Sequence, residues 1–124
     1  MIRYYPSIWF GTLDEEAIRV VCIVPKREKG VVVKSLDLFL STQQEPGTSD
    51  YWSFDLGTVV GQMEFVSRFP YADPKRGYPK GRNPVFFGRV VAYDPGEVMA
   101  VRALPVGAPA DLVELQVVVG MEEP

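Results

Sequence analysis

The sequence predicts an all-β fold: a single antiparallel β-sandwich or jelly roll of about seven to eight strands, formed by residues 1–124 as one domain. Short segments rich in Val, Phe and Leu recur at spacings of roughly 8 to 15 residues, and polar or Pro/Gly-rich turns divide them. No stretch carries the apolar period of a long helix. With 124 residues, 47% of them hydrophobic, the chain can bury one core without a metal or a disulfide.

The first segment, residues 1–12, is an aromatic arm that carries Tyr4, Tyr5, Trp9 and Phe10. Chain ends fray unless contacts hold them, so four aromatic side chains indicate that this end is packed. Two interpretations stay open. The rings cover the core of their own domain, or the arm packs on a neighbouring subunit of a homo-oligomer.

The next segments alternate between turn and strand. Thr12 and Glu15 have the spacing of a capping box, which predicts one helical turn. Residues 17–24 are rich in β-branched side chains and predict a strand that ends at Pro25. Residues 26–30 predict a charged hairpin loop, since they combine four charged side chains with a glycine.

Three strands are expected in the middle of the chain, and a polar loop at 42–50 separates the first strand from the second. Residues 31–41 alternate strongly, and the apolar face is predicted to hold Val32, Leu36, Leu38 and Leu40. Residues 51–56 alternate as well, with Ser53 and Asp55 outward and an inward face of Trp52, Phe54 and Leu56. A further strand up to Pro70 is indicated by the alternation of Met63, Phe65 and Phe69 with polar residues.

Residues 70–84 predict a long loop, because four prolines exclude regular structure over any length. Residues 68–89 contain six basic residues and one acidic residue, a local charge of +5 in a chain of net charge −3. We interpret this basic, Pro-rich loop as a partner-binding surface, with a solvated connection between strands as the open alternative. The residues predicted to bind the partner are Tyr71, Lys75, Arg76, Tyr78, Lys80 and Arg82.

The last third of the chain predicts strands at 85–93, 98–104 and 112–119, followed by a short acidic tail at 120–124. Between the first two, Asp94 to Glu97 fits a type II turn in which Gly96 has a positive φ. The apolar face of the last strand is predicted to hold Val113, Leu115, Val117 and Val119.

The composition argues against an enzyme. Histidine is absent, which removes the commonest general base and metal ligand. Cys22 is the one cysteine and is expected to be a small buried side chain, and the run from Asp14 to Glu16 is expected to be solvated. We therefore predict no catalytic, cofactor-binding or metal-binding residue. A weakly acidic chain with one basic loop also argues against nucleic-acid binding, and no segment predicts a signal peptide or a membrane span.

Several short motifs carry a family resemblance. They are Val24-Pro25 before the aliphatic strand at 31–40, the aromatic run at 49–54, and the late segments at 95–102 and 107–112. In this order they resemble the small β-sandwich domains of tailed-bacteriophage virions, found in capsid decoration proteins and in head or tail fibre proteins. The resemblance covers residues 17–119, and it does not extend to the aromatic arm or the basic loop.

The resemblance implies a non-enzymatic viral structural protein without a cofactor. It would be made in the host cytoplasm, reside in the virion, associate with itself, with a homotrimer expected, and dock on capsid or tail proteins. Two alternatives stay open. The first is a carbohydrate-binding module that uses surface rings, for which the candidates are Tyr51, Trp52, Tyr71 and Tyr78. The second is a small regulatory protein that binds a host enzyme.

Overall fold

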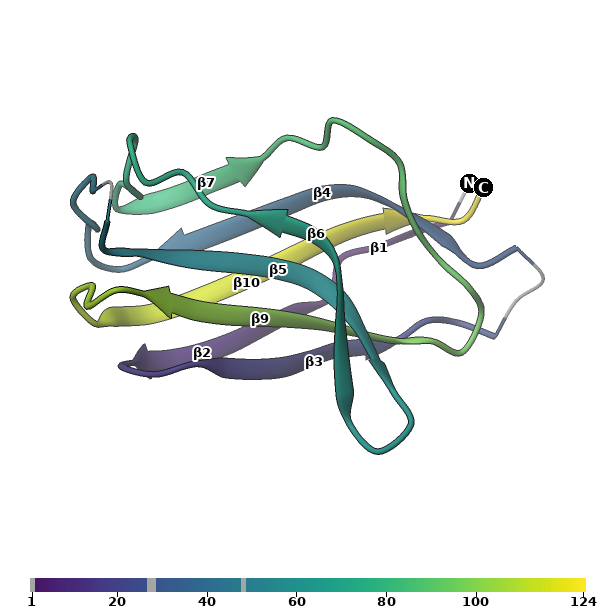
Figure 1. Cartoon of the computed structure of the whole chain (residues 1–124). Coiled ribbons are helices and arrows are strands. Elements are labelled where there is room, and N and C mark those ends of the chain that lie inside the picture. Colours follow the sequence, from purple (N-terminus) through teal and green to yellow (C-terminus); the bar gives the residue numbers. More distant parts are fainter. Residues whose placement is uncertain (1, 27–28, 48) are drawn as a thin grey trace.

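The computed structural model describes residues 2–26, 29–47 and 49–124, so Arg27 and Glu28 of the predicted charged loop lie outside the described residues. These segments form two antiparallel sheets, as the alternating sequence predicts, but they contain ten strands rather than the expected seven to eight (Figure 1). Sheet A contains β1 (Arg3–Tyr4), β2 (Ser7–Leu13), β4 (Val31–Leu40), β7 (Gly81–Val85), β8 (Val91–Tyr93) and β10 (Leu112–Glu122). Sheet B contains β3 (Ala17–Ile23), β5 (Tyr51–Val60), β6 (Glu64–Tyr71) and β9 (Val98–Val106).

Each sheet is four positions wide. In sheet A the order is β1-β10-β4-β7, where β2 pairs further along β10 and β8 pairs further along β4. In sheet B the order is β3-β9-β5-β6. The central strands β10, β4, β9 and β5 therefore have partners on both sides, and the two edges of sheet A are β1 with β2, and β7 with β8.

The core lies between the two sheets and takes side chains from both. The predicted inward residues Trp52, Phe54 and Leu56 are fully buried, as are Met99 and Val101 from the neighbouring β9. From sheet A the core receives Leu36, Leu38, Leu115, Val117 and Val119. The predicted inward residues of these central strands are thus confirmed, while the side chain of Val113 lies outside the described part of the chain. The prediction that Asp55 is exposed is wrong, because Asp55 is buried and pairs with Arg102.

The predicted face of β4 is wrong at one residue. Leu36, Leu38 and Leu40 are buried, but Val32 is only half-buried, while its neighbours Val31 and Val33 face the core. The pairing with β10 shifts between Gly120 and Met121, so that Lys34 is an extra residue on β4. Such a bulge reverses the alternation on either side of it, which the apolar pattern alone does not reveal.

The aromatic arm is part of sheet A. β1 and β2 pair with β10, so the described residues contain strand, and no helical turn, where Thr12 suggested a capping box. Phe10 is buried in the core and Tyr4 packs against it, which confirms the core-covering interpretation for these two rings. Tyr5 and Trp9 remain exposed.

The segment after β5 also departs from the prediction. β6 runs to Tyr71 and β7 begins at Gly81, so the Pro-rich loop is shorter than residues 70–84. The predicted strand at 85–93 is interrupted, because residues 86–90 leave the sheet between β7 and β8. Pro84 is tolerated in β7 because this strand lies at the sheet edge, where no further strand needs its amide.

Two turns at the end of the chain complete the comparison. Gly96 has a φ of 80°, and the amide of Glu97 donates to the carbonyl of Asp94 at 3.2 Å, which confirms the predicted turn. The prediction of a short acidic tail at 120–124 is wrong, because β10 continues to Glu122 and pairs with β1.

Candidate functional site

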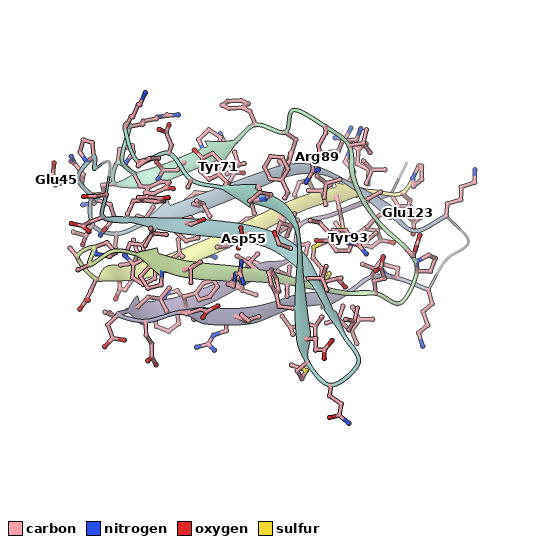
Figure 2. The ribbon with its side chains drawn as sticks, in the orientation of Figure 1. Glu45, Asp55, Tyr71, Arg89, Tyr93 and Glu123 are labelled. Carbon is pink, nitrogen blue, oxygen red and sulfur yellow. The ribbon has the colours of Figure 1, made fainter. Side chains whose placement is uncertain are left out.

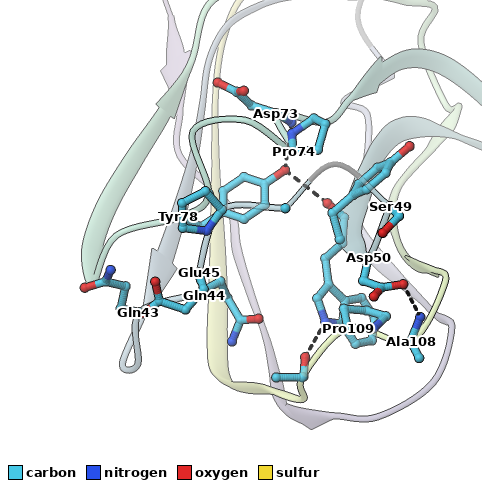
Figure 3. A pocket seen from close by; sticks show the side chains of 16 residues that line it. Gln43, Gln44, Glu45, Ser49, Asp50, Asp73, Pro74, Tyr78, Ala108 and Pro109 are labelled. Carbon is cyan, nitrogen blue, oxygen red and sulfur yellow. Dashed lines mark hydrogen bonds between the residues drawn. The ribbon is translucent and has the colours of Figure 1, made fainter.

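Three loops meet at the end of the sandwich opposite the N- and C-termini (Figure 1). They are residues 41–50 between β4 and β5, residues 72–80 between β6 and β7, and residues 107–111 between β9 and β10. Between them lies a cavity of about 300 Å³, which we call the end-loop pocket (Figure 3). The side chains that matter for its chemistry are Gln43, Glu45, Asp50, Tyr51, Asp73 and Tyr78.

Tyr78 holds two of the loops together. Its hydroxyl donates to the carbonyl of Trp52 at 3.0 Å and accepts from the amide of Asp73 at 3.3 Å. Its backbone pairs with Gln44 through two hydrogen bonds, and its ring packs edge-on against Phe54 at 5.5 Å. Burial raises the pKa of Tyr78, so the hydroxyl stays protonated and keeps donating.

Trp52 and Asp50 hold the third loop. The indole Nε1 of Trp52 donates to the carbonyl of Ala110 at 2.8 Å, and Asp50 Oδ1 accepts from the amide of Ala108 at 3.0 Å (Figure 3). Gly107 has a φ of 71°, and a Cβ there would collide with the Asp50 carboxylate. The loop therefore needs glycine at this position, both for its backbone conformation and for space.

The pocket offers a ligand carboxylate oxygens that accept hydrogen bonds and an aromatic ring for stacking. The Glu45 side chain is exposed, and Asp50 and Asp73 each have one carboxylate oxygen in a backbone hydrogen bond. Tyr51 is half-buried beside them. Among the described residues no group of three or more His, Cys, Asp or Glu could hold a metal ion. This arrangement suits the binding of a hydroxyl-rich or cationic group rather than proton transfer.

The structure separates the residues predicted to bind a partner. Lys75, Arg76 and Lys80 are exposed on the loop before β7. Arg82 lies within β7 and forms an ion pair with Asp37 at 2.9 Å. The prediction is wrong for Tyr78, which is only 3% exposed, because its hydroxyl and ring are used inside the protein.

Tyr71 is half-buried at the end of β6 and contacts the Tyr78 ring at 6.3 Å (Figure 2). Of the proposed sugar-stacking rings, Trp52 and Tyr78 are thus buried, while Tyr51 and Tyr71 retain some exposure. An isolated aromatic-rich segment does not reveal which rings the fold will cover.

The two terminal arginines of the basic stretch have internal partners. Arg68 donates to the carbonyl of Ala92 at 2.7 Å, pairs with Glu97, and lies over the ring of Tyr93 at 4.6 Å. Arg89 donates to the carbonyl of Arg68. The freely exposed positive charge is therefore smaller than the +5 of the sequence stretch, and it lies beside the carboxylates of the end-loop pocket.

Glu97 responds to this environment. Burial alone would raise its pKa, but the hydrogen bond from the Asp94 amide and the guanidinium of Arg68 lower it, and the net shift is downward. The short β8–β9 turn is thus tied electrostatically to β6.

Sequence reasoning missed a second exposed feature. Phe86 and Val90, in the segment between β7 and β8, are 80% and 77% exposed. The sequence signal for this feature is the break in alternation around Gly88, within the segment 85–93 that is predicted as one continuous strand.

Cys22 is half-buried, and burial raises the pKa of its thiol. The run from Asp14 to Glu16 is exposed, as expected.

Comparison with known proteins gives a likeness in structure. No protein-family model matches the chain, and no curated protein matches its sequence. A solved structure described as the cyanophage Pam1 capsid asymmetric unit contains a chain that is similar in fold, with a TM-score of 0.53 and 18% sequence identity. The match covers 99% of this chain and 84% of the other. At this identity the likeness concerns the fold.

Proposed function

We propose that this chain is a non-enzymatic viral structural protein, a single domain over residues 1–124 that associates with itself and with capsid or tail proteins in the virion. The observation that carries the proposal is the likeness to a chain of a cyanophage capsid over 99% of this chain. A decoration or fibre subunit fits best, because both classes need a compact β domain with interaction surfaces and no reaction chemistry.

The strand connections support a jelly roll. The chain passes from one sheet to the other between β2 and β3, β3 and β4, β4 and β5, β6 and β7, β8 and β9, and β9 and β10. Among the strands of the described residues, only β5 and β6 form a hairpin inside one sheet. Two sheets, each four strand positions wide, with such crossing connections are the double-sheet arrangement that many viral capsid domains use.

The chemistry of the site supports a binding role. The whole sequence lacks histidine, and Cys22 lies away from the end-loop pocket with a raised pKa, so it is a poor nucleophile. None of the described residues forms a helix of the length and apolar character that crossing a membrane requires. From the likeness to a capsid chain we infer that the protein resides in the virion.

The exposed cations beside the end-loop pocket are the proposed docking surface for an acidic patch on a capsid or tail protein. Lys75, Arg76 and Lys80 project from a loop that hydrogen bonds and prolines hold in place, so little conformational entropy is lost on docking. Each exposed charge contributes only about 0 to 1 kcal/mol, so the attraction is collective and weakened by salt.

Co-expression with the capsid and tail proteins of the same genome tests this function. Particles purified on a density gradient should carry the chain at a fixed ratio to the capsid protein, measured by gel densitometry. A chain that stays entirely in the soluble fraction at low salt would contradict the proposal.

One observation favours a second function, carbohydrate binding. The Tyr51 ring borders the end-loop pocket beside the Asp50 and Asp73 carboxylates, and a sugar uses both a flat ring and hydrogen-bond acceptors. A glycan array probed with the wild type and with Tyr51→Ala tests it. Specific glycan binding that is lost in the variant would support this function, and no binding to any glycan would rule it out.

A further inference from the structure

The two strands that pair with one side of β4 leave a gap between them. β7 pairs with β4 up to the Leu36–Val85 pair, and β8 resumes at the Val33–Val91 pair. Two residues of β4 therefore face five residues, 86–90, which we call the β7–β8 segment. The surplus residues leave the sheet, and a hollow of about 540 Å³ lies between the segment and β4.

The β7–β8 segment is anchored to β6 by two of its side chains. The Phe87 ring packs on the ring of Phe69 at 4.7 Å, and the Arg89 guanidinium lies over the same ring at 5.7 Å. Arg89 also donates to the carbonyl of Arg68. The hollow is therefore formed before any partner binds, so little conformational entropy is lost on binding.

The hollow has an apolar lining. Val32, Val33 and Val85 line it from β4 and β7. Phe86 and Val90 line it from the segment, and they are 80% and 77% exposed, the two largest fractions among the exposed large hydrophobic residues of the described chain. Exposed apolar side chains grouped around a hollow are typical of a surface that binds another apolar group.

The charged residues that line the hollow are all cationic. They are Lys34 and Arg89, and among the described residues no Asp or Glu lines it. A smaller hollow of about 270 Å³ shares Arg89 and Val90 with the first. Its other charged lining residue is Arg68, and it too has no Asp or Glu in the described part of its lining. The linings themselves therefore carry the positive charge.

Lys34 and Arg89 have no carboxylate partner within the described residues, unlike several arginines of the sheets. Those that pair with a carboxylate of this chain are Arg3, Arg68, Arg82 and Arg102. The Lys34 side chain is exposed, and Arg89 contacts a ring and a carbonyl, both uncharged. Glu122 of β10 lies opposite Val32, but it pairs with Arg3. The positive charge at the hollow is thus not neutralised by the described chain, and an acidic partner complements it.

We propose that this hollow is a docking site for a short segment of another protein in which an Asp or Glu stands next to a Phe, Leu, Ile or Val. The carboxylate of that segment pairs with Lys34 and with Arg89, whose guanidinium offers parallel donors. The apolar side chain packs against Phe86 and Val90. The site is separate from the end-loop pocket, with which it shares no lining residue.

Selection from a library of random short peptides displayed on filamentous phage tests the site. The library is passed first over the immobilised variant Lys34→Glu with Arg89→Glu, which keeps the apolar side chains and reverses both charges, and then over the wild type. Peptides that the wild type retains should carry an acidic residue beside an apolar one. A selection that yields no peptide specific for the wild type, or peptides without acidic residues, overturns the proposal.

Fluorescence anisotropy with the best selected peptide then measures the contribution of the charges. The double reversal should weaken binding by about tenfold or more, because repulsion replaces two exposed charge contacts. The matched control is Lys26→Glu with Lys29→Glu, which makes the same change in net charge at exposed lysines that line neither hollow and should bind as the wild type does. Equal affinities for the two double variants overturn the proposal.

A second pair of variants tests the apolar half of the site. Phe86→Ser with Val90→Ser should lose the peptide while the melting temperature stays unchanged, because both side chains are exposed. Met63→Ser changes a similarly exposed side chain, 69% exposed on the turn after β5, and should bind as the wild type does. If both variants bind the peptide equally well, the apolar contact is refuted and the proposal with it.

Flotation with vesicles of phosphatidylcholine and phosphatidylserine tests an anionic membrane as the partner instead, since cations beside exposed apolar side chains also bind lipid. The wild type should stay in the soluble fraction. Co-flotation that the double reversal abolishes assigns the surface to lipid and overturns the peptide site. None of these assays uses particles, so their failure leaves the proposed virion role standing, and absence of the chain from particles leaves this site standing.

Discussion

Replacing Tyr78 by Phe removes one hydroxyl at the point where the β5–β6 ladder ends. The pairing of Phe54 with Tyr71 sets Trp52 opposite Asp73, and the Tyr78 hydroxyl bridges the carbonyl of the first and the amide of the second. On its other side Trp52 faces Pro105, which has no amide hydrogen. The variant thus leaves a buried carbonyl without its donor.

The expected cost follows from this geometry. A buried polar group that loses its partner destabilises the native state by about 1 to 3 kcal/mol. With an unfolding entropy of about 2.1 cal/mol/K per residue, the 124-residue chain loses about 4 to 12 °C in melting temperature. The apolar part of the ring and its contact with Phe54 are retained, so the fold survives.

Thermal melts followed by circular dichroism measure the effect, and Tyr71→Phe is the matched control. Tyr71 is half-buried next to Tyr78, and the described part of the chain provides no hydrogen bond to its hydroxyl. We expect the control to melt near the wild type. If Tyr78→Phe melts as high as Tyr71→Phe, the hydroxyl bridge does not hold the end-loop pocket together.

Three further predictions concern the turn, its ion pair and the basic loop. Gly96→Val should destabilise the protein by about 1 to 3 kcal/mol, because Gly96 has a positive φ, whereas Gly88→Val has open space and no such φ and should melt near the wild type. Because the folded-state pKa of Glu97 is lowered, its interaction with Arg68 contributes fully above the ordinary value of 4.5 and is lost as the pH falls through the folded-state pKa. Acid titrations of the melting temperature should therefore show a drop that Glu97→Gln, about 1 kcal/mol less stable at neutral pH, lacks; parallel titration curves would refute this. Replacing Lys75, Arg76, Lys80 and Arg82 together by Ser should leave the melting temperature nearly unchanged and lower the occupancy on purified particles, most strongly at low salt. Equal occupancy at low and high salt would contradict the docking surface.

The central strands could be predicted from the sequence because their signal is local. In the first half of β5 the core residues Trp52, Phe54 and Leu56 alternate with Ser53 and Asp55 in the sequence, so the period of two identifies the core face directly. The turn at Gly96 is also local, since Pro and Gly select its type.

The errors arise where distant segments meet. The pairing of β1 and β2 with β10 joins the two ends of the chain, and it holds Thr12 in a strand despite its capping-box spacing. The bulge at Lys34 depends on the register of β10. No residue near Lys34 signals it, because the register of a distant strand decides the face.

The candidate site was predictable only in part. The exposure of Lys75, Arg76 and Lys80 follows from a polar, Pro-rich segment. The burial of Tyr78 does not, because it requires the loop before β7 to fold back on Trp52 of β5, which lies 26 residues earlier in the sequence. Because the aromatic arm forms strands of sheet A, deleting residues 1–10 would remove β1 and most of β2. Such a deletion would therefore test folding as much as assembly.

The native mass of the purified protein tests the central claim most directly. Light scattering coupled to size exclusion should give one closed multiple of the 13.9 kDa chain, unchanged on dilution, because the proposed function requires a surface that another copy covers. A trimer is the expected multiple. A mass of 13.9 kDa at every concentration would contradict the self-assembling structural role.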